Sequence, residues 1–383
     1  MNRTEPLDRL IEEKDFDAFL MRESSENANM YYLTQFPRSD PFIFLRQNGE
    51  SRIIVSQLEY SRAKEEAKVD EVLSKDEFAT EIDGKRTANL IEVVADKSDI
   101  DRLAVPNDFP LKLADELRDE IKLQPVENRV MEARKVKGEE EVEQLRTAQK
   151  ATEEAMQKVK SMIEDAEIRD GELYLEDEML TSEKVKREAR KFLLDKDCST
   201  TEGMIVACGE DSAKPHSTGS GVLKAGKPIV VDIFPQHENR YFGDMTRTFV
   251  KDKMSEELRE MKDAVMKARK AAFKVLEQGA GVDASEVHAA VCDVFEERGF
   301  DTLRQGDTEF GFIHSTGHAV GLELHETPGI GRKEEELEAG NVLTIEPGLY
   351  LPEIGGVRIE DMILVKEDGF ENFNTMNREV KVE

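Results

Sequence analysis

Cysteine is scarce in this chain, which has only Cys198, Cys208 and Cys292 among 383 residues. No two of them have the spacing of a zinc finger or a dithiol redox motif, and an odd number gives no disulfide framework. The chain also lacks an apolar run of 18 residues, and its charged first 14 residues lack the apolar centre of a secretory signal. These absences argue against a membrane protein and predict a cytoplasmic one.

Basic residues are also few relative to acidic ones, with 54 Lys and Arg against 83 Asp and Glu and a formal net charge of -29. Such a charge argues against nucleic acid and anionic membranes as partners. It suggests a protein that stays soluble in high salt, where screening weakens self-repulsion. No serine or cysteine nucleophile arrangement and no phosphate-binding glycine loop is recognisable, so the sequence offers no sign of these two kinds of site.

The length of the chain favours two domains rather than one core. The first, residues 1–128, is predicted to be a small α/β domain. Phe16–Met21 reads as a strand, and the segments 41–45 and 52–55 read as a hairpin around Asn48-Gly49. The aromatic residues of the stretch 29–36 are interpreted as core.

The second domain, residues 129–383, is predicted to alternate helices and strands. A charged helix is expected over about 139–164 and a second helix over 171–195. Apolar residues at three-and-four spacing predict two more helices, over about 255–278 and 284–298. Residues 310–383 are expected to be mainly strand and loop.

Four carboxylates and one imidazole lie in apolar or glycine-rich stretches of this second domain. Each alone could be an ordinary residue at a strand end. However, a charged side chain on an apolar strand is costly unless it is paired or bound to metal. Five such groups are best explained by a common cation site, and mostly hard oxygen ligands suit two divalent metal ions. The five residues are Asp232, Asp244, His318, Glu346 and Glu360.

Two of these stretches show the strand pattern directly. The run 227–231 reads as a buried strand that leads into Asp232. Arg358 and Glu360 are expected to share one face of a single strand, because side chains alternate with period two.

The order Asp, Asp, His, Glu, Glu resembles that of the pita-bread metallopeptidases, peptidase family M24, which includes methionine aminopeptidase, aminopeptidase P, prolidase and the metal-free creatinase. The resemblance implies an α/β (α+β) protein. Residues 1–128 would form a creatinase-type N-terminal domain, and residues 129–383 would form the pita-bread catalytic domain. It also implies that Asp244 and Glu360 bridge two metals, that Asp232 chelates one of them, and that a hydroxide lies between the ions.

The same resemblance assigns roles to further residues. His318 and Glu346 would hold the other metal, with Glu346 also acting as general base. His325 would contact the substrate and stabilise the tetrahedral intermediate. His216 would lie at the rim of the substrate pocket. Arg358 could orient a ligand carboxylate or contact substrate. The residues expected to bind substrate are therefore three histidines and one arginine: His216, His314, His325 and Arg358.

The short spacing between Glu346 and Glu360, together with His314, resembles the proline-specific members. The expected function is therefore metal-dependent hydrolysis of the peptide bond before proline, with Mn²⁺ favoured over Co²⁺ or Zn²⁺ and with a homodimeric assembly. Phe234 departs from the usual glycine, and the loop between the two aspartates is one residue longer than usual. Three alternatives stay open: an Xaa-Pro aminopeptidase on longer peptides, a creatinase-like or lyase-like enzyme on a small molecule, and a binding module. His237 and His288 are interpreted as structural.

Overall fold

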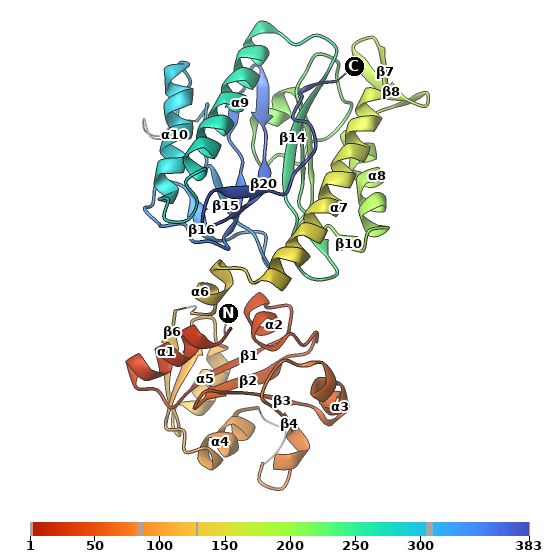
Figure 1. The fold of residues 1–383 in the computed structure, drawn as a ribbon. Coiled ribbons are helices and arrows are strands. Elements are labelled where there is room, and N and C mark those ends of the chain that lie inside the picture. The colour runs from red at the N-terminus through yellow and green to blue at the C-terminus, as the bar shows by residue number, and fades with distance from the viewer. Residues whose placement is uncertain (1–2, 83–86, 128, 304–308, 383) are drawn as a thin grey trace. The chain divides into compact units, whose positions relative to one another are not determined.

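The computed structural model describes residues 3–82, 87–127, 129–303 and 309–382. The chain divides after Arg134 into two compact units (Figure 1). The boundary between 128 and 129 stays a prediction, and residue 128 lies outside the described set. In the described ranges, no helix is both long enough and apolar enough to cross a membrane.

The smaller unit is built on a mixed six-stranded sheet in the order β4-β3-β2-β1-β5-β6. Its centre, β1, pairs antiparallel with β2 and parallel with β5. The strands are β1 Ala18–Glu23, β2 Phe42–Gln47, β3 Glu50–Val55, β4 Glu71–Ser74, β5 Arg102–Pro106 and β6 Lys122–Val126. The helices are α1 Glu5–Lys14, α2 Ala28–Thr34, α3 Gln57–Glu66, α4 Thr87–Lys97, α5 Leu111–Leu117 and α6 Val130–Lys135, with a 3-10 turn at Lys75–Phe78.

The predicted hairpin of this unit is confirmed. Asn48 and Gly49 both have positive φ, 51° and 77°, as a two-residue turn between right-twisted strands requires. The stretch around Tyr32 is the helix α2, which begins at Asn27, whose side chain accepts hydrogen bonds from two backbone amides. Tyr32 and Phe36 are fully buried, so these two aromatic side chains are core.

The larger unit consists of two halves, each a sheet covered by a pair of helices (Figure 1). In the first half, α7 and α8 pack on the sheet β11-β12-β14-β22. Its elements are α7 Glu139–Glu164, β7 Glu167–Arg169, β8 Glu172–Leu175, β9 Glu178–Met179, α8 Ser182–Leu194, β10 Cys198–Ser199, β11 Ile205–Cys208, a 3-10 turn at Gly209–Ala213, β12 Ile229–Ile233, β13 Gln236–His237 and β14 Met245–Lys251.

In the second half, α9 and α10 pack on the sheet β16-β15-β17-β20-β21. Its elements are α9 Glu256–Leu276, α10 Ala284–Glu297, β15 Gly317–Ala319, β16 Glu326–Ile330, β17 Val342–Ile345, β18 Gly348–Leu351, β19 Gly355–Arg358, β20 Asp361–Val365 and β21 Phe370–Asn372. The last strand, β22 Lys381–Val382, returns to the edge of the first sheet beside β14. The predicted helices over 139–164, 255–278 and 284–298 are confirmed.

The predicted helix over 171–195 is wrong in its first half. Residues 167–179 form the small antiparallel sheet β7-β8-β9, and α8 begins only after Thr181, whose hydroxyl accepts from the Lys184 amide. Positive φ at Asp170 and Gly171 makes the first turn of this sheet. Asp-Gly is a strong hairpin signal, and it outweighs the apolar spacing from which the helix was predicted.

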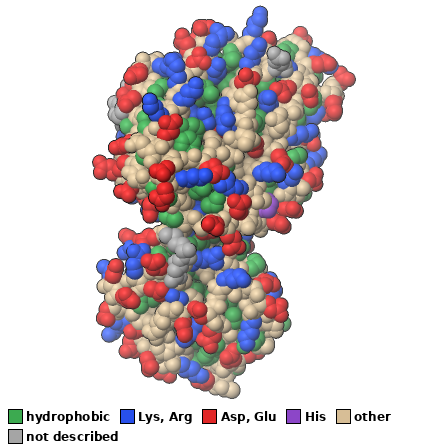
Figure 2. Space-filling view, viewed as in Figure 1, with side chains coloured by type: hydrophobic (Ala, Val, Ile, Leu, Met, Phe, Trp, Pro, Cys, Tyr) green, Lys and Arg blue, Asp and Glu red, His purple; other side chains and the backbone are tan. Residues whose placement is uncertain are grey.

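The surface of both units carries charges of both signs. Figure 2 shows acidic side chains interspersed with basic ones over the visible face. The excess of acidic residues therefore does not segregate into one separate region of that face.

Candidate metal centre

The first half of the larger unit contributes Asp232 and Asp244. Asp232 lies on the fully buried strand β12, in register with Thr246 on β14. Asp244 immediately precedes β14, and its peptide groups are held by Gln149 of α7. The Asp244 amide donates to Gln149 Oε1 (2.7 Å), and Gln149 Nε2 donates to the Asp244 carbonyl (2.8 Å). A Cβ atom on Gly243 would lie 2.1 Å from the Thr152 hydroxyl, so only glycine lets this turn approach α7.

The second half contributes His318, which lies on β15. Its Nδ1–H donates to the Ala319 carbonyl (3.1 Å), which leaves Nε2 as the bare nitrogen. Nε2 lies 3.6 Å from Asp244 Oδ2 and 3.7 Å from Glu346 Oε1. Burial lowers the pKa of His318 to about 4, so the ring is neutral and suited to bind a cation through Nε2.

Glu346 and Glu360 lie just outside strands rather than within them. Glu346 follows β17, and its amide donates to the Thr316 carbonyl (2.7 Å). The single strand expected around Glu360 is wrong: β19 ends at Arg358 and β20 begins at Asp361, because the two segments pair with different partners. The side chains of Arg358 and Glu360 nevertheless meet at Thr246. Arg358 Nε donates to the Thr246 hydroxyl (3.1 Å), and this hydroxyl donates to Glu360 Oε2 (2.8 Å).

The carboxylates of this cluster crowd one another in a buried setting. Burial, reinforced by neighbouring carboxylates, raises the pKa of Asp244 and of Glu360 well above the usual values. Burial also raises the pKa of Glu346 to about 7, although Arg358 opposes this shift. Several acids that resist ionisation together form a site that favours positive charge.

The donor set fits divalent cations. One ligand atom each from Asp244, His318 and Glu360 lies within 4.8 Å of the others. Asp232 Oδ2 accepts from Arg358 Nη2 (2.7 Å), while its buried Oδ1 has no hydrogen-bond partner among the described residues. A buried carboxylate oxygen without a partner is costly, and a cation would satisfy it. Carboxylate oxygens with one imidazole suit hard or borderline divalent ions.

A second chain of contacts extends from the cluster through Arg358. Its Nη1 donates to the Tyr350 hydroxyl (2.8 Å), which in turn lies 2.9 Å from His314 Nε2. His314 Nδ1–H donates to the Ser315 carbonyl, so the Tyr350 hydroxyl donates to Nε2. Burial lowers the pKa of His314 to about 3 and raises that of Tyr350 to about 12, so both groups are neutral around pH 7.

Tyr350 was missed in the sequence. The only available signal was a tyrosine inside an apolar strand, since a buried phenol needs a hydrogen-bond partner. Its partners come from segments before and after it in the chain, and nothing in the local sequence identifies them.

The remaining histidines lie at different distances from the cluster. The exposed His325 ring packs on His318, with ring centroids 4.4 Å apart. His216 is exposed in a turn, close enough to His314 to add to the lowering of the His314 pKa by burial and Arg358. His237 Nδ1 accepts from the Asn239 amide within its own loop (3.2 Å). The buried His288 bonds the Thr316 hydroxyl (2.9 Å).

Phe234 is half-buried directly after β12. The longer loop that it opens contains β13, which pairs with β10.

Comparison with known proteins agrees with this geometry. The profile of metallopeptidase family M24 matches residues 143–367, and that of the creatinase/prolidase N-terminal domain matches residues 3–136. Two helix-covered half-sheets around an acidic cluster are the pita-bread architecture of metal-dependent hydrolases. The chain belongs to metallopeptidase family M24, and the peptidases of this family use divalent metal ions.

Individual relatives match along nearly the whole chain. The Xaa-Pro dipeptidase of Pyrococcus furiosus is 31% identical over 99% of both chains, and that of Pyrococcus horikoshii is 30% identical over 97% of this chain and 96% of the relative. Among solved structures, the prolidase from Pyrococcus furiosus has a TM-score of 0.79 at 25% identity and covers 97% of this chain and 99% of its own. The X-Pro aminopeptidase from Thermotoga maritima MSB8 has a TM-score of 0.79 at 26% identity, with 98% and 99% covered.

Proposed function

We propose that this chain is an Xaa-Pro dipeptidase that hydrolyses the bond before proline with two divalent metal ions. The observation that carries the proposal is the convergence of Asp244, His318 and Glu360 within 4.8 Å, in a chain similar over its full length to Xaa-Pro dipeptidases. In this proposal Asp232 and Glu346 would complete the ligand set, and Asp244 and Glu360 would be shared between the two ions.

Metal ions held by these residues would lower the pKa of a water molecule and polarise the scissile carbonyl. Glu346 is the proposed general base, since a pKa raised by burial to about 7 suits proton transfer near neutral pH. The ring of His325 stands beside His318, where it could donate to the developing oxyanion.

Arg358 is proposed to orient the Asp232 carboxylate. Each of its three guanidinium nitrogens bonds a different residue, namely Asp232, Tyr350 and Thr246. Substrate contact is therefore assigned to the histidines. His314 is held by Tyr350, and His216 lies in the exposed turn nearby.

Mn²⁺ is the proposed metal, because four of the five ligands are carboxylates and manganese prefers oxygen donors. A homodimer is the proposed assembly, on the resemblance to the family. Light scattering on the purified protein tests the assembly. The cytoplasm is the proposed compartment, since no cysteine spacing calls for oxidising conditions.

The rival function is an Xaa-Pro aminopeptidase on longer peptides. It is supported by the likeness to the Thermotoga maritima X-Pro aminopeptidase, which has the same TM-score as the prolidase. The dipeptidase is preferred because two relatives with at least 30% identity along nearly the whole chain are Xaa-Pro dipeptidases. The five potential ligands are all present, which argues against a metal-free creatinase-like role and a binding module.

One assay separates the dipeptidase from its rival. The purified protein is stripped with a chelator and reloaded with Mn²⁺ or Co²⁺, at low and at high salt. It is then offered an Xaa-Pro dipeptide and an Xaa-Pro-Yaa tripeptide. Metal-dependent cleavage of the dipeptide alone supports the proposal, and cleavage of the tripeptide supports the aminopeptidase. If neither is cleaved by folded protein that contains metal, the peptidase proposal is wrong.

A further inference from the structure

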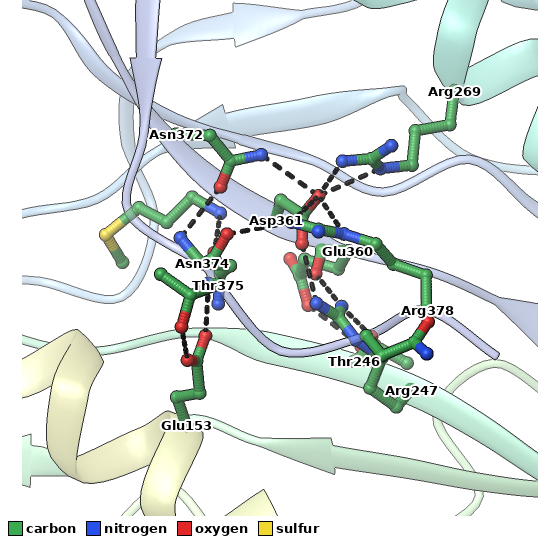
Figure 3. Close-up of polar contacts among 12 residues, drawn as sticks. Glu153, Thr246, Arg247, Arg269, Glu360, Asp361, Asn372, Asn374, Thr375 and Arg378 are labelled. Carbon is green, nitrogen blue, oxygen red and sulfur yellow. Dashed lines mark hydrogen bonds and ion pairs between the residues drawn. The ribbon is translucent and has the colours of Figure 1, made fainter.

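A cluster of three arginines surrounds one buried carboxylate immediately behind the candidate metal centre (Figure 3). The carboxylate is that of Asp361, the first residue of β20, which is completely buried. Arg247 Nη2 donates to its Oδ1 (2.7 Å), and Arg269 Nε donates to its Oδ2 (2.8 Å). Arg378 Nη2 lies 3.2 Å from Oδ2, and Asn372 Nδ2 also donates to Oδ2 (3.2 Å).

Burying these charges costs desolvation free energy, so stability alone is a poor explanation for the cluster. Asp361, Arg247 and Arg269 are all buried, so their ion pairs carry a desolvation cost. Replacing buried ion pairs by apolar side chains of similar volume is often neutral or stabilising. Three guanidinium groups around one carboxylate also leave positive charge in excess, which an apolar core would avoid.

Arg247 differs from its two neighbours because it also bonds the backbone of the metal centre. Its Nη1 donates to the Thr246 carbonyl (2.9 Å) and to the Glu360 carbonyl. One guanidinium therefore joins Asp361 to the peptide groups of two residues at the site. In the described part of the chain, the hydrogen bonds of Arg269 go to Asp361 alone.

These carbonyls belong to the residues that direct the Glu360 carboxylate. The Glu360 amide donates to the Thr246 carbonyl (3.0 Å), and the Thr246 hydroxyl donates to Glu360 Oε2 (2.8 Å). Asp361 follows Glu360 directly, and successive side chains of an extended chain point to opposite sides. The charge cluster thus lies behind the backbone whose front presents Glu360 to Asp244 and His318.

We propose that Arg247, anchored by Asp361, is a positioning residue for the metal centre. It fixes the peptide groups of Thr246 and Glu360 and so sets the direction of the Glu360 carboxylate. The inference rests on the proposed metal centre, and it assigns Arg247 no contact with substrate or metal. Groups that orient metal ligands in this way commonly change metal affinity by about 10- to 100-fold when they are removed.

The test compares two substitutions that preserve charge. Arg247→Lys keeps a cation beside Asp361 but cannot reach the carboxylate and both carbonyls at once. Arg269→Lys is the matched control, because it also weakens the charge cluster without touching the backbone of the site. Metal-free proteins are titrated with Co²⁺, the visible absorbance reports the ligand field, and competition with a chelator gives the affinity. Thermal unfolding of each metal-free variant measures the structural cost.

The expected result is a Co²⁺ affinity about 10- to 100-fold weaker for Arg247→Lys with an altered absorbance spectrum, and a wild-type spectrum and affinity for Arg269→Lys. A purely structural cluster would lower the Tm of both variants and leave both affinities alike, which would overturn the proposal.

Thr246→Val is the second variant in case Arg247→Lys does not fold. It leaves the charge cluster intact and removes the hydroxyl that donates to Glu360 and accepts from Arg358 Nε. Thr246→Ser keeps this hydroxyl and should restore binding. If Thr246→Val binds Co²⁺ with wild-type affinity, the proposal that Thr246 transmits the positioning effect of Arg247 to Glu360 is wrong. Failure of the wild-type protein itself to bind Co²⁺ would overturn the proposed metal centre and this inference with it.

Discussion

Replacing Glu346 by glutamine should stabilise the metal-free protein at neutral pH and leave it unchanged at acidic pH. Burial raises the pKa of this carboxyl from 4.5 to about 7 in the folded state. Between these values the folded protein binds a proton that the unfolded chain has lost, so stability falls as pH rises. Glutamine mimics the protonated carboxyl at every pH and avoids this loss.

The size of the effect follows from the shift. At about 1.4 kcal/mol per pKa unit, the ionised carboxylate costs the metal-free fold about 3 kcal/mol above pH 7. For a unit of this size, that corresponds to a difference on the order of 10 °C in Tm. The pKa values of His314 and His318 are lowered and act in the opposite direction below pH 6.5, but both proteins contain them and their contributions cancel in the comparison.

The assay is urea unfolding of wild type and Glu346→Gln after chelation, at several values from about pH 5 to about pH 8. The variant should gain on wild type progressively over this range. Added metal should reverse the order, since wild type keeps a ligand that the variant lacks. A difference in unfolding free energy that does not change with pH would refute the argument that burial without metal holds Glu346 protonated.

Three further outcomes follow from other parts of the chain. Arg358→Lys should lower kcat/KM on an Xaa-Pro dipeptide by about 10- to 100-fold, because lysine cannot serve Asp232, Tyr350 and Thr246 together; unchanged kinetics would contradict the orienting role. Lys137→Met should reduce the free energy of unfolding by about 3–5 kcal/mol, because it leaves the buried Glu326 carboxylate without its 2.6 Å partner; a loss below about 1 kcal/mol in urea titrations would show that the pair is solvated. Raising KCl from about 0.1 M to about 1 M should increase Tm, because the Debye length falls from about 10 Å to about 3 Å around a chain of charge -29. No gain above modest salt would rule out adaptation to high salt.

Local patterns in the sequence were sufficient where one element decides the outcome. The helices α7, α9 and α10 follow their predicted ranges closely, because each presents a continuous apolar face, and Gly279 and Gly299 follow the ends of α9 and α10. The prediction failed at 171–195, where turn residues inside an apolar pattern changed helix into hairpin. It also failed at 357–361, where one extended run divides between two partners.

The sequence by itself determined the family, the fold class and the set of candidate ligands, because five acidic or imidazole groups in apolar settings need a common explanation. Only the tertiary structure decided which of these groups meet and what holds them. The hydrogen bonds of Asp232 to Arg358, Glu360 to Thr246 and Asp361 to Arg247 each join residues more than 110 positions apart, on strands of the two different halves. Neither Tyr350 nor Arg247 carries a local signal of its contacts. Hydrogen bonds over such separations depend on how the two sheets pack, and periodicity along one segment does not encode that packing.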